Sequence, residues 1–216
     1  MRYGESTFDI LYLVFAIGTG IWILARRPGS VGRILGAMAL ILGAGDAFHL
    51  VPRVLNYFYS ADFTAALGIG KLITSITMTV FYLLLFMVWR KVCSSAENRH
   101  LTAAVIILTV LRILLCLFPQ NGWFSNSTNL LWAVIRNIPF ILLGALIVVL
   151  FYQRRDKYPP FRRIWFWVLL SFLFYIPVAV GAGLLPALGM LMLPKTVCYI
   201  ILLIIFIRSV REDTEL

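Results

Sequence analysis

Charged side chains are scarce in this 216-residue chain: 13% of its residues are Asp, Glu, Lys or Arg, against about 25% in a typical soluble domain. Hydrophobic residues make up 62%, and a soluble fold of this composition would have to expose a large apolar area to water. The composition therefore excludes a water-soluble protein. At about 20 residues a span, the chain is long enough for roughly seven membrane-spanning helices with short loops.

Cysteine and histidine are also rare. The three cysteines (Cys93, Cys116 and Cys198) are too few and too widely spaced for a disulfide framework or a paired-cysteine zinc motif. With only two histidines, the chain lacks the ligands of the zinc-dependent seven-span hydrolases, the alkaline ceramidases and progestin-receptor-like proteins. Lys195 lies at the outer end of the last expected span, whereas microbial rhodopsins hold retinal in the middle. We expect no metal and no cofactor.

Apolar runs between charge clusters and turn residues predict an all-α integral membrane protein, a single seven-helix domain over residues 1–216. The last two spans are the hardest to divide, because residues 164–207 are almost continuously apolar and Gly181 and Pro186 could mark either a tight turn or a broken helix. The expected spans are Ile10–Ala25, Ile34–Val51, Ala65–Trp89, Leu101–Phe118, Leu130–Tyr152, Ile164–Leu185 and Leu188–Ile207.

The placement of the basic residues predicts the orientation. A net charge of +10 would suggest nucleic-acid binding in a soluble chain, but thirteen of the 19 Lys and Arg residues lie in alternate loops and near the C-terminus. They are Arg26, Arg27, Arg33, Arg90, Lys91, Arg99, Arg154, Arg155, Lys157, Arg162, Arg163, Arg208 and Arg211. By the positive-inside rule the N-terminus lies outside and the C-terminus in the cytoplasm. We therefore expect a multi-pass protein of the cell membrane with no nucleic-acid partner.

Ionisable residues inside the spans mark the candidate site, because each costs free energy in lipid. Asp46, His49 and Arg53 are spaced so that they fall within about a 60° arc of one helix. Asp46 is the only acidic residue expected well inside a span. Other polar residues follow in spans three to five: Lys71, Thr74, Ser75, Arg112, Arg136 and Asn137. With the predicted orientation all of them lie in the outer half of the membrane.

One shared, outward-facing cavity is the expectation for these residues, since charges in lipid need partners or water. The three cations Lys71, Arg112 and Arg136 against the one carboxylate of Asp46 indicate an anionic ligand, such as a phosphate or carboxylate headgroup. Asp46 and His49 could form an acid–base pair in which activated water attacks an ester, vinyl ether or phosphodiester. In the purely structural alternative, Asp46 pairs with Lys71 or Arg112, and Lys71 and Arg136 extend to the outer headgroups.

One short motif points to a family. Gly45-Asp46-Ala47 is followed by Leu50, Pro52 and Arg53, and the next span opens with the small residues Gly68 and Gly70. Over residues 33–72 this pattern resembles the glycine–aspartate segment of bacterial lysoplasmalogenase-type membrane proteins. The resemblance implies that Asp46 takes part in hydrolysing the vinyl ether of a lysophospholipid. The chain departs from the family around Thr77 to Thr79, where the family has a histidine.

Three classes of function fit the sequence. The first is an enzyme acting on a lipid or other amphiphile at the outer leaflet, with Asp46 and His49 as acid and base. The second is a transporter or channel for a small anion, for which a chain of this length would need to form a homodimer. The third is a membrane sensor or accessory subunit. The polar lining stops halfway across the membrane, which favours the first class over the second. Membrane lipids are the expected partners.

The orientation can be tested by cysteine labelling. The variant Ser125→Cys, in the loop between expected spans four and five, should react with a membrane-impermeant thiol reagent on intact cells, because that loop is predicted to lie outside. The variant Asp156→Cys should react only after the cells are permeabilised. Labelling of Asp156→Cys in intact cells would contradict the predicted orientation.

Overall fold

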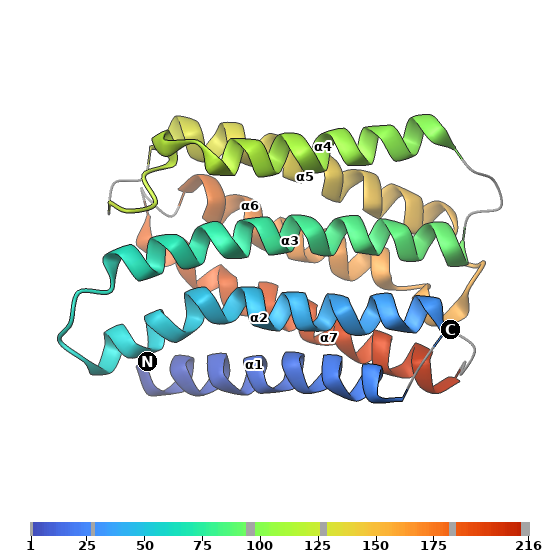
Figure 1. Ribbon diagram of the computed structural model, residues 1–216, viewed down its shortest axis with the longest axis horizontal. Helices are drawn as coiled ribbons and strands as arrows, with labels where there is room; N and C mark the ends of the chain where they lie inside the picture. Colours follow the sequence, from blue (N-terminus) through green and yellow to red (C-terminus); the bar gives the residue numbers. More distant parts are fainter. Residues whose placement is uncertain (1, 27–28, 94–97, 126–128, 182–184, 213–216) are drawn as a thin grey trace.

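Seven long α-helices make up the computed structural model, which describes residues 2–26, 29–93, 98–125, 129–181 and 185–212 (Figure 1). Three short 3-10 helices follow α4, α5 and α6: Pro119–Asn121, Pro159–Phe161 and Pro186–Leu191. The α-helices are α1 Arg2–Ala25, α2 Ser30–Phe58, α3 Thr64–Val92, α4 Arg99–Leu117, α5 Leu130–Gln153, α6 Ile164–Gly181 and α7 Met192–Glu212.

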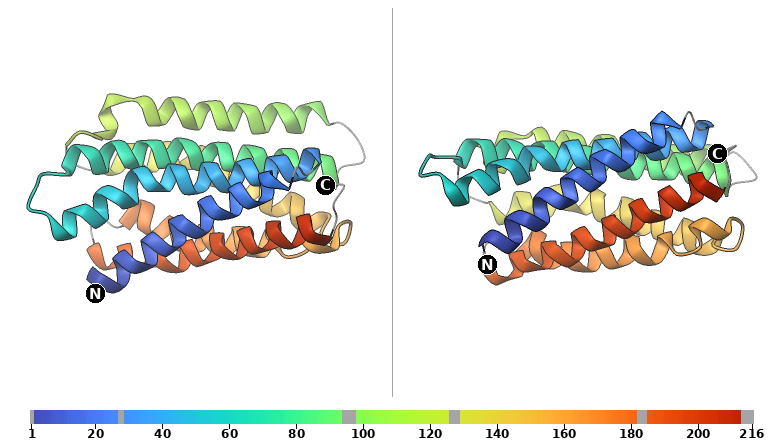
Figure 2. Two further views of the ribbon diagram at one scale, coloured as in Figure 1. Left: turned by 60° about the horizontal axis from the view of Figure 1, so that its bottom comes forward. Right: turned by 90° about the horizontal axis from the view of Figure 1, so that it is seen from below.

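Each helix packs against its neighbours in the chain, and α7 also packs against α1, which closes the seven helices into one bundle. Within the bundle α3 additionally contacts α5, and α2 contacts α7. Helix α1 runs obliquely across the bundle (Figure 2). As a result α1, α2 and α7 come together although they lie at the two ends of the sequence.

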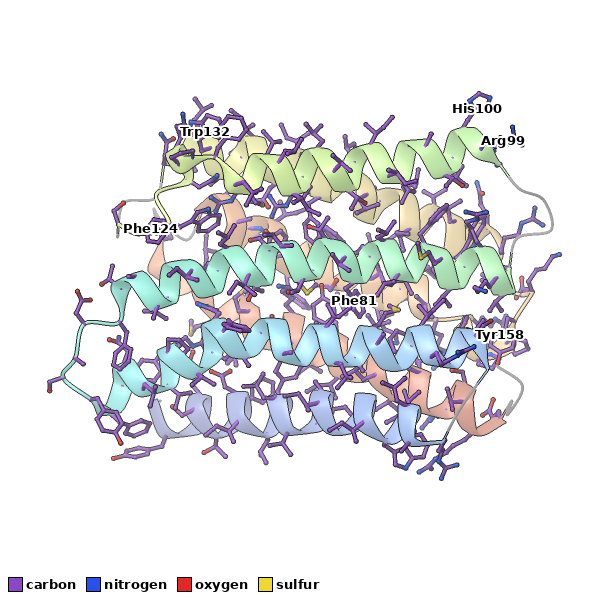
Figure 3. All side chains as sticks on the ribbon, in the orientation of Figure 1. Phe81, Arg99, His100, Phe124, Trp132 and Tyr158 are labelled. Carbon is purple, nitrogen blue, oxygen red and sulfur yellow. The ribbon has the colours of Figure 1, made fainter. Side chains whose placement is uncertain are left out.

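The surface confirms a membrane protein. All seven helices are long and apolar enough to cross a bilayer. Large aliphatic side chains on α4, such as Ile107 and Leu114, point away from the bundle and are more than half exposed. In water such a surface would be unfavourable, but in lipid it is the expected one. The buried core is aliphatic and aromatic, and Phe81 lies at its centre, midway between the two ends of the bundle (Figure 3).

The predicted number of spans is confirmed, but several boundaries are wrong. Helix α1 begins at Arg2 instead of Ile10, so its acidic residues Glu5 and Asp9 belong to the helix. Helix α2 does not end at Val51 and continues through Pro52 to Phe58. A hydropathy pattern assigns polar residues near a helix end to a loop. In the structure, these residues are helical and extend α1 and α2 toward the membrane surface.

The last two spans are two separate helices, and residues 182–184 of the break between them lie outside the described residues. Helix α6 ends at Gly181, earlier than the expected Leu185, and α7 begins at Met192, later than the expected Leu188. The 3-10 helix Pro186–Leu191 connects toward α7. Proline at the first position of this short helix suits it, because proline has no N–H to donate and its φ is already helical.

The two ends of the bundle differ in charge. The basic residues assigned to the cytoplasmic side lie at the end that carries the C-terminus, apart from Arg27, which is outside the described residues. Arg99 and His100 mark this end in Figure 3, and Phe124 and Trp132 mark the opposite end. The N-terminus and the connections α2–α3, α4–α5 and α6–α7 lie at that opposite end, which we call the outer end.

Helices α2 and α3 approach closely at two glycines. A Cβ atom on Gly70 would lie 2.1 Å from the carbonyl oxygen of Phe48, and one on Gly45 would lie 2.1 Å from the hydroxyl oxygen of Thr77. Both distances are far below van der Waals contact. Gly70 therefore allows the two helix backbones to touch, and Gly45 leaves room for the Thr77 side chain, as small residues do in many membrane helix pairs.

Replacing Gly70 by alanine should separate α2 from α3 and lower the free energy of unfolding by about 1–3 kcal/mol, the usual cost of overpacking. The measurement is thermal unfolding of the purified protein in detergent. Gly18→Ala is the matched control, because nothing lies within 4 Å of a Cβ there. Alanine favours helix over glycine, so this control should be neutral or stabilising. Equal stability of the two variants would contradict the close approach.

Candidate functional site

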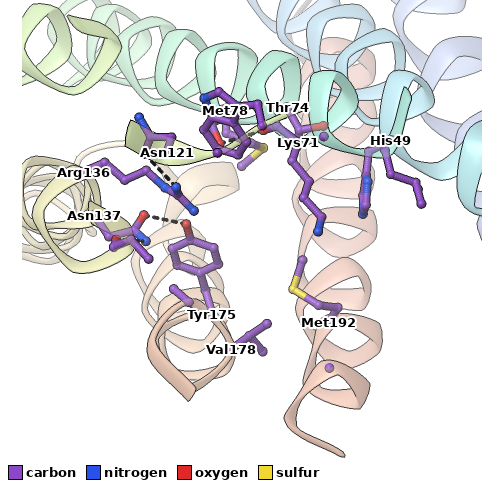
Figure 4. Close-up of a pocket in the computed structure, with 18 of the residues that line it drawn as sticks. His49, Lys71, Thr74, Met78, Asn121, Arg136, Asn137, Tyr175, Val178 and Met192 are labelled. Carbon is purple, nitrogen blue, oxygen red and sulfur yellow. Dashed lines mark hydrogen bonds between the residues drawn. The ribbon is translucent and has the colours of Figure 1, made fainter. Parts of the chain in front are cut away.

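The outer end contains a cavity of about 710 Å³ (Figure 4). Side chains of α2 to α7 line it, together with the connection that follows α4. Along α3 it runs from Thr64 to Met78, about 20 Å at the helical rise of about 1.5 Å per residue. The cavity therefore begins at the rim of the bundle and ends near its middle.

Most of the predicted site residues share this cavity. Of the nine, all but Asp46 line it. The eight are His49, Arg53, Lys71, Thr74, Ser75, Arg112, Arg136 and Asn137. The sequence missed Lys195, which makes a fifth cationic side chain in the lining, while no Asp or Glu of the described chain lines the cavity. The cavity is thus strongly positive.

Arg112 is the most buried of these cations, with 1% of its surface exposed. One of its terminal nitrogens donates a hydrogen bond to the backbone carbonyl of Arg136, and its guanidinium lies 5.2 Å from the centre of the Phe140 ring. Its Nε has no hydrogen-bond partner in the described part of the chain, and it forms no ion pair there. A buried guanidinium with unused donors is a strong site for an anion.

Arg136 is held in place by the connection after α4. Its terminal nitrogen donates to Oδ1 of Asn121 at 2.8 Å, and its guanidinium stacks 4.5 Å from the Trp123 ring. Asn121 in turn donates to the carbonyls of Leu115, Cys116 and Phe118 at the end of α4. Asn121 therefore caps α4 and positions Arg136 at once.

A close contact fixes this connection against α3. Gly122 has a φ of 64°, in the left-handed region that favours glycine. A Cβ on Gly68 of α3 would lie 1.5 Å from the carbonyl oxygen of Trp123. The indole nitrogen of Trp123 donates to the carbonyl of Cys116 at 2.8 Å. The wall that carries Arg136 is thus built rigidly onto α3 and α4.

The hydroxyl groups of α3 have structural partners. Thr74 donates to the carbonyl of Gly45 on α2, and Ser75 donates to the carbonyl of Lys71 one turn earlier. Asn137 of α5 donates to the carbonyl of Ala133 and accepts a 2.7 Å hydrogen bond from Tyr175 of α6. These side chains line the cavity, but their hydrogen bonds serve mainly to hold the helices together.

Arg53 is already neutralised. Its guanidinium pairs with Glu5 at 2.5 Å and with Asp9 at 3.0 Å, and Tyr57 donates to the other oxygen of Glu5. The expectation that Asp46 is the only acidic residue well inside a span is therefore wrong, because Asp9 is buried in α1. The signal was present in the sequence: Glu5, Asp9 and Tyr12 continue one face of α1 at helical spacing.

Asp46 lies outside the main cavity, in an adjoining pocket of about 50 Å³ that also contains Lys195 and His49. Its Oδ2 accepts a 2.6 Å hydrogen bond from the Tyr12 hydroxyl of α1. It forms no ion pair with any described residue, so the alternative in which it pairs with Lys71 or Arg112 is wrong.

The Asp46–His49 pair is not joined by a hydrogen bond in the described structure. Nδ1 of His49 is buried and has no hydrogen-bond partner among the described residues. His49 lines both the main cavity and the small pocket, so it lies at the junction between them. The two residues therefore share a location without forming the predicted orienting contact.

Lys195 connects the same two spaces, since it lines both of them. Its ammonium group lies 4.9 Å from the centre of the Tyr175 ring and 5.6 Å from that of Tyr199. Such contacts stabilise a buried cation. No spacing rule links Lys195 to Asp46, because they meet only through the packing of α7 against α2.

A metal is poorly accommodated here. No group of three or more His, Cys, Asp or Glu side chains in the described ranges is arranged to hold a metal ion. The donor set of the cavity is cationic and amide-rich, which suits an anion instead.

Comparison with protein-family models, curated proteins and solved structures finds no match for this chain.

Proposed function

We propose that this multi-pass membrane protein binds an amphiphile with an anionic headgroup in the cavity at its outer end. The observation that carries the proposal is the lining of that cavity: five Lys and Arg side chains and, in the described chain, no carboxylate. A positive cavity within a bundle of apolar helices is unfavourable unless an anion occupies it, because charge is costly in low-dielectric surroundings.

The rest of the lining suits the apolar part of such a ligand. Met78, Phe140 and Val178 line the cavity beside the cations, and Leu67 and Leu130 line it nearer the rim. Pockets that take small organic ligands combine mostly apolar walls with a few convergent polar groups. The outer end lies among lipid-facing helices, so an amphiphile of the same membrane is the ligand most readily available.

The bundle below the cavity supports binding instead of permeation. Phe81, Tyr82 and Leu85 of α3 are fully buried directly below Met78. The Tyr82 hydroxyl is hydrogen-bonded to the Tyr199 hydroxyl at 3.0 Å. Because it is already paired, it has little capacity to solvate a passing ion. An ion pathway needs hydratable groups along its whole length, and this layer offers few.

Binding should depend on the headgroup and on Arg136. We expect lysophosphatidylglycerol to bind at least about tenfold more tightly than lysophosphatidylcholine with the same acyl chain, since only the former carries net negative charge. Arg136→Gln should remove most of this preference. Affinity can be measured by ligand-induced thermal stabilisation of the purified protein in detergent.

Arg99→Gln is the matched control, because Arg99 is exposed at the opposite end of the bundle. It should leave both affinities unchanged. Equal binding of the two lipids by the unaltered protein would contradict the proposal.

A second candidate is hydrolysis of such an amphiphile, and the small pocket beside the cavity favours it. Asp46, His49 and Lys195 all line that pocket, and His49 and Lys195 also line the cavity where the headgroup would bind. A carboxyl group there can activate water as the carboxylate or donate a proton as the acid. The resemblance of residues 33–72 to lysoplasmalogenase-type proteins points to the same residue, Asp46, and to a vinyl-ether lysophospholipid as substrate.

Asp46→Asn should then abolish turnover of lysophospholipids, vinyl-ether forms included, by at least about 100-fold, the usual contribution of a general acid or base. Product release by the reconstituted protein can be followed by mass spectrometry. Asp62→Asn is the control, since Asp62 is an exposed residue of the α2–α3 loop. Full turnover by a folded Asp46→Asn protein would exclude this candidate and leave the binding proposal intact.

A further inference from the structure

Two of the five cations in the cavity lie near carboxyl groups of the protein. Arg53 pairs with both Glu5 and Asp9 of α1. Lys195 lines the same small pocket as Asp46, although the two form no ion pair among the described residues.

The other three cations have no acidic partner among the described residues. Lys71, Arg112 and Arg136 come from three different helices, α3, α4 and α5, and all line the same cavity. They are close enough to interact unfavourably: Lys71 with Arg136, and Arg136 with Arg112. Figure 4 shows Lys71 and Arg136 pointing into the cavity from opposite walls.

These side chains also have hydrogen-bond donors to spare. The ammonium group of Lys71 makes no hydrogen bond to any residue the structure describes, and Nε of Arg112 is buried without a partner. Arg136 uses one terminal nitrogen to reach Asn121. Lys71 and Arg136 therefore offer donors to a ligand in the cavity, and the nearly fully buried Arg112 adds positive charge behind them.

A ligand with a single negative charge would leave most of this charge uncompensated. A phosphodiester or a carboxylate carries one charge, whereas a phosphomonoester carries about 1.5 to 2 negative charges at pH 7 and has three strong acceptor oxygens. Such a headgroup therefore balances more of the positive charge of the three cations than a monoanion does. Arginine in particular binds phosphate through two parallel hydrogen bonds.

We propose that the cavity is specific for a phosphomonoester dianion, bound between Lys71, Arg112 and Arg136. This inference rests on the proposed function, since it names the headgroup of the ligand that the cavity binds. It does not depend on whether the ligand is then hydrolysed.

The test compares three lysophospholipids with the same acyl chain. Lysophosphatidic acid has a phosphomonoester headgroup, lysophosphatidylglycerol a monoanionic phosphodiester, and lysophosphatidylcholine a zwitterionic one. Titrated into the purified full chain in detergent, lysophosphatidic acid should bind at least about tenfold more tightly than lysophosphatidylglycerol. Equal affinity of these two would overturn the inference while leaving the proposed function in place. Equal affinity of all three would overturn both.

Variants test whether the three cations cause the preference. Lys71→Met and Arg136→Gln should each weaken the binding of lysophosphatidic acid by about tenfold and that of lysophosphatidylglycerol by less. The preference for lysophosphatidic acid over lysophosphatidylglycerol should therefore shrink. Arg99→Gln should leave it unchanged. Lys71 is exposed in the lining, so its replacement keeps the test decisive even if a variant of the buried Arg112 fails to fold. An unchanged preference in both Lys71→Met and Arg136→Gln would overturn the assignment of these residues.

Glycerol 3-phosphate distinguishes a lipid from a soluble source of the same headgroup. If the ligand is a membrane lipid, glycerol 3-phosphate should compete with lysophosphatidic acid only at concentrations at least about a hundredfold higher, because it lacks the acyl chain. Competition at similar concentrations would keep the phosphomonoester site and identify its ligand as a soluble phosphate. The phosphomonoester site would be overturned if glycerol 3-phosphate did not compete at any concentration and lysophosphatidic acid bound no more tightly than lysophosphatidylglycerol.

Discussion

A charged group inside a membrane protein must find its counter-charge or its hydrogen bonds within the protein, because lipid offers neither. The outer half of this bundle meets that requirement in two ways. Arg53 is neutralised by Glu5 and Asp9, and Asp46 is held by Tyr12. Lys71, Arg112 and Arg136 instead line one cavity without a carboxylate partner among the described residues. That contrast between compensated and uncompensated charge is the basis for the proposed ligand.

Helix α1 is responsible for much of the compensation. It supplies Glu5, Asp9 and Tyr12 to partners on α2, so it removes the Arg53 charge from the cavity and fixes the carboxyl group of Asp46. Removing one partner of such a buried pair is costly, since the other charge is left alone. Arg53 and Asp46 lie on the same face of α2. Helix α1 gives each of them its own partner: Glu5 and Asp9 for Arg53, and Tyr12 for Asp46.

The seven helices, the grouping of polar residues at one end and eight of the residues that line the cavity can be predicted from the sequence, since hydropathy and charge placement follow directly from the solvent properties of lipid. Partners brought together by helices distant in the chain cannot be predicted in this way. Lys195 meets Asp46 only because α7 packs against α2, and Asn121 reaches Arg136 only because the connection after α4 folds back. The hydrogen bond between Tyr12 and Asp46 depends on how α1 packs against α2.

The buried aromatic layer of Phe81, Tyr82 and Tyr199 lies below the cavity and fills the middle of the bundle. A lipid that places its headgroup above this layer stays on its own side of the bilayer midplane and never has to flip. Occupancy of the cavity is then set by the composition of one leaflet alone. Under the proposed function, the protein would respond to the lipid composition of one leaflet and not to that of the whole membrane.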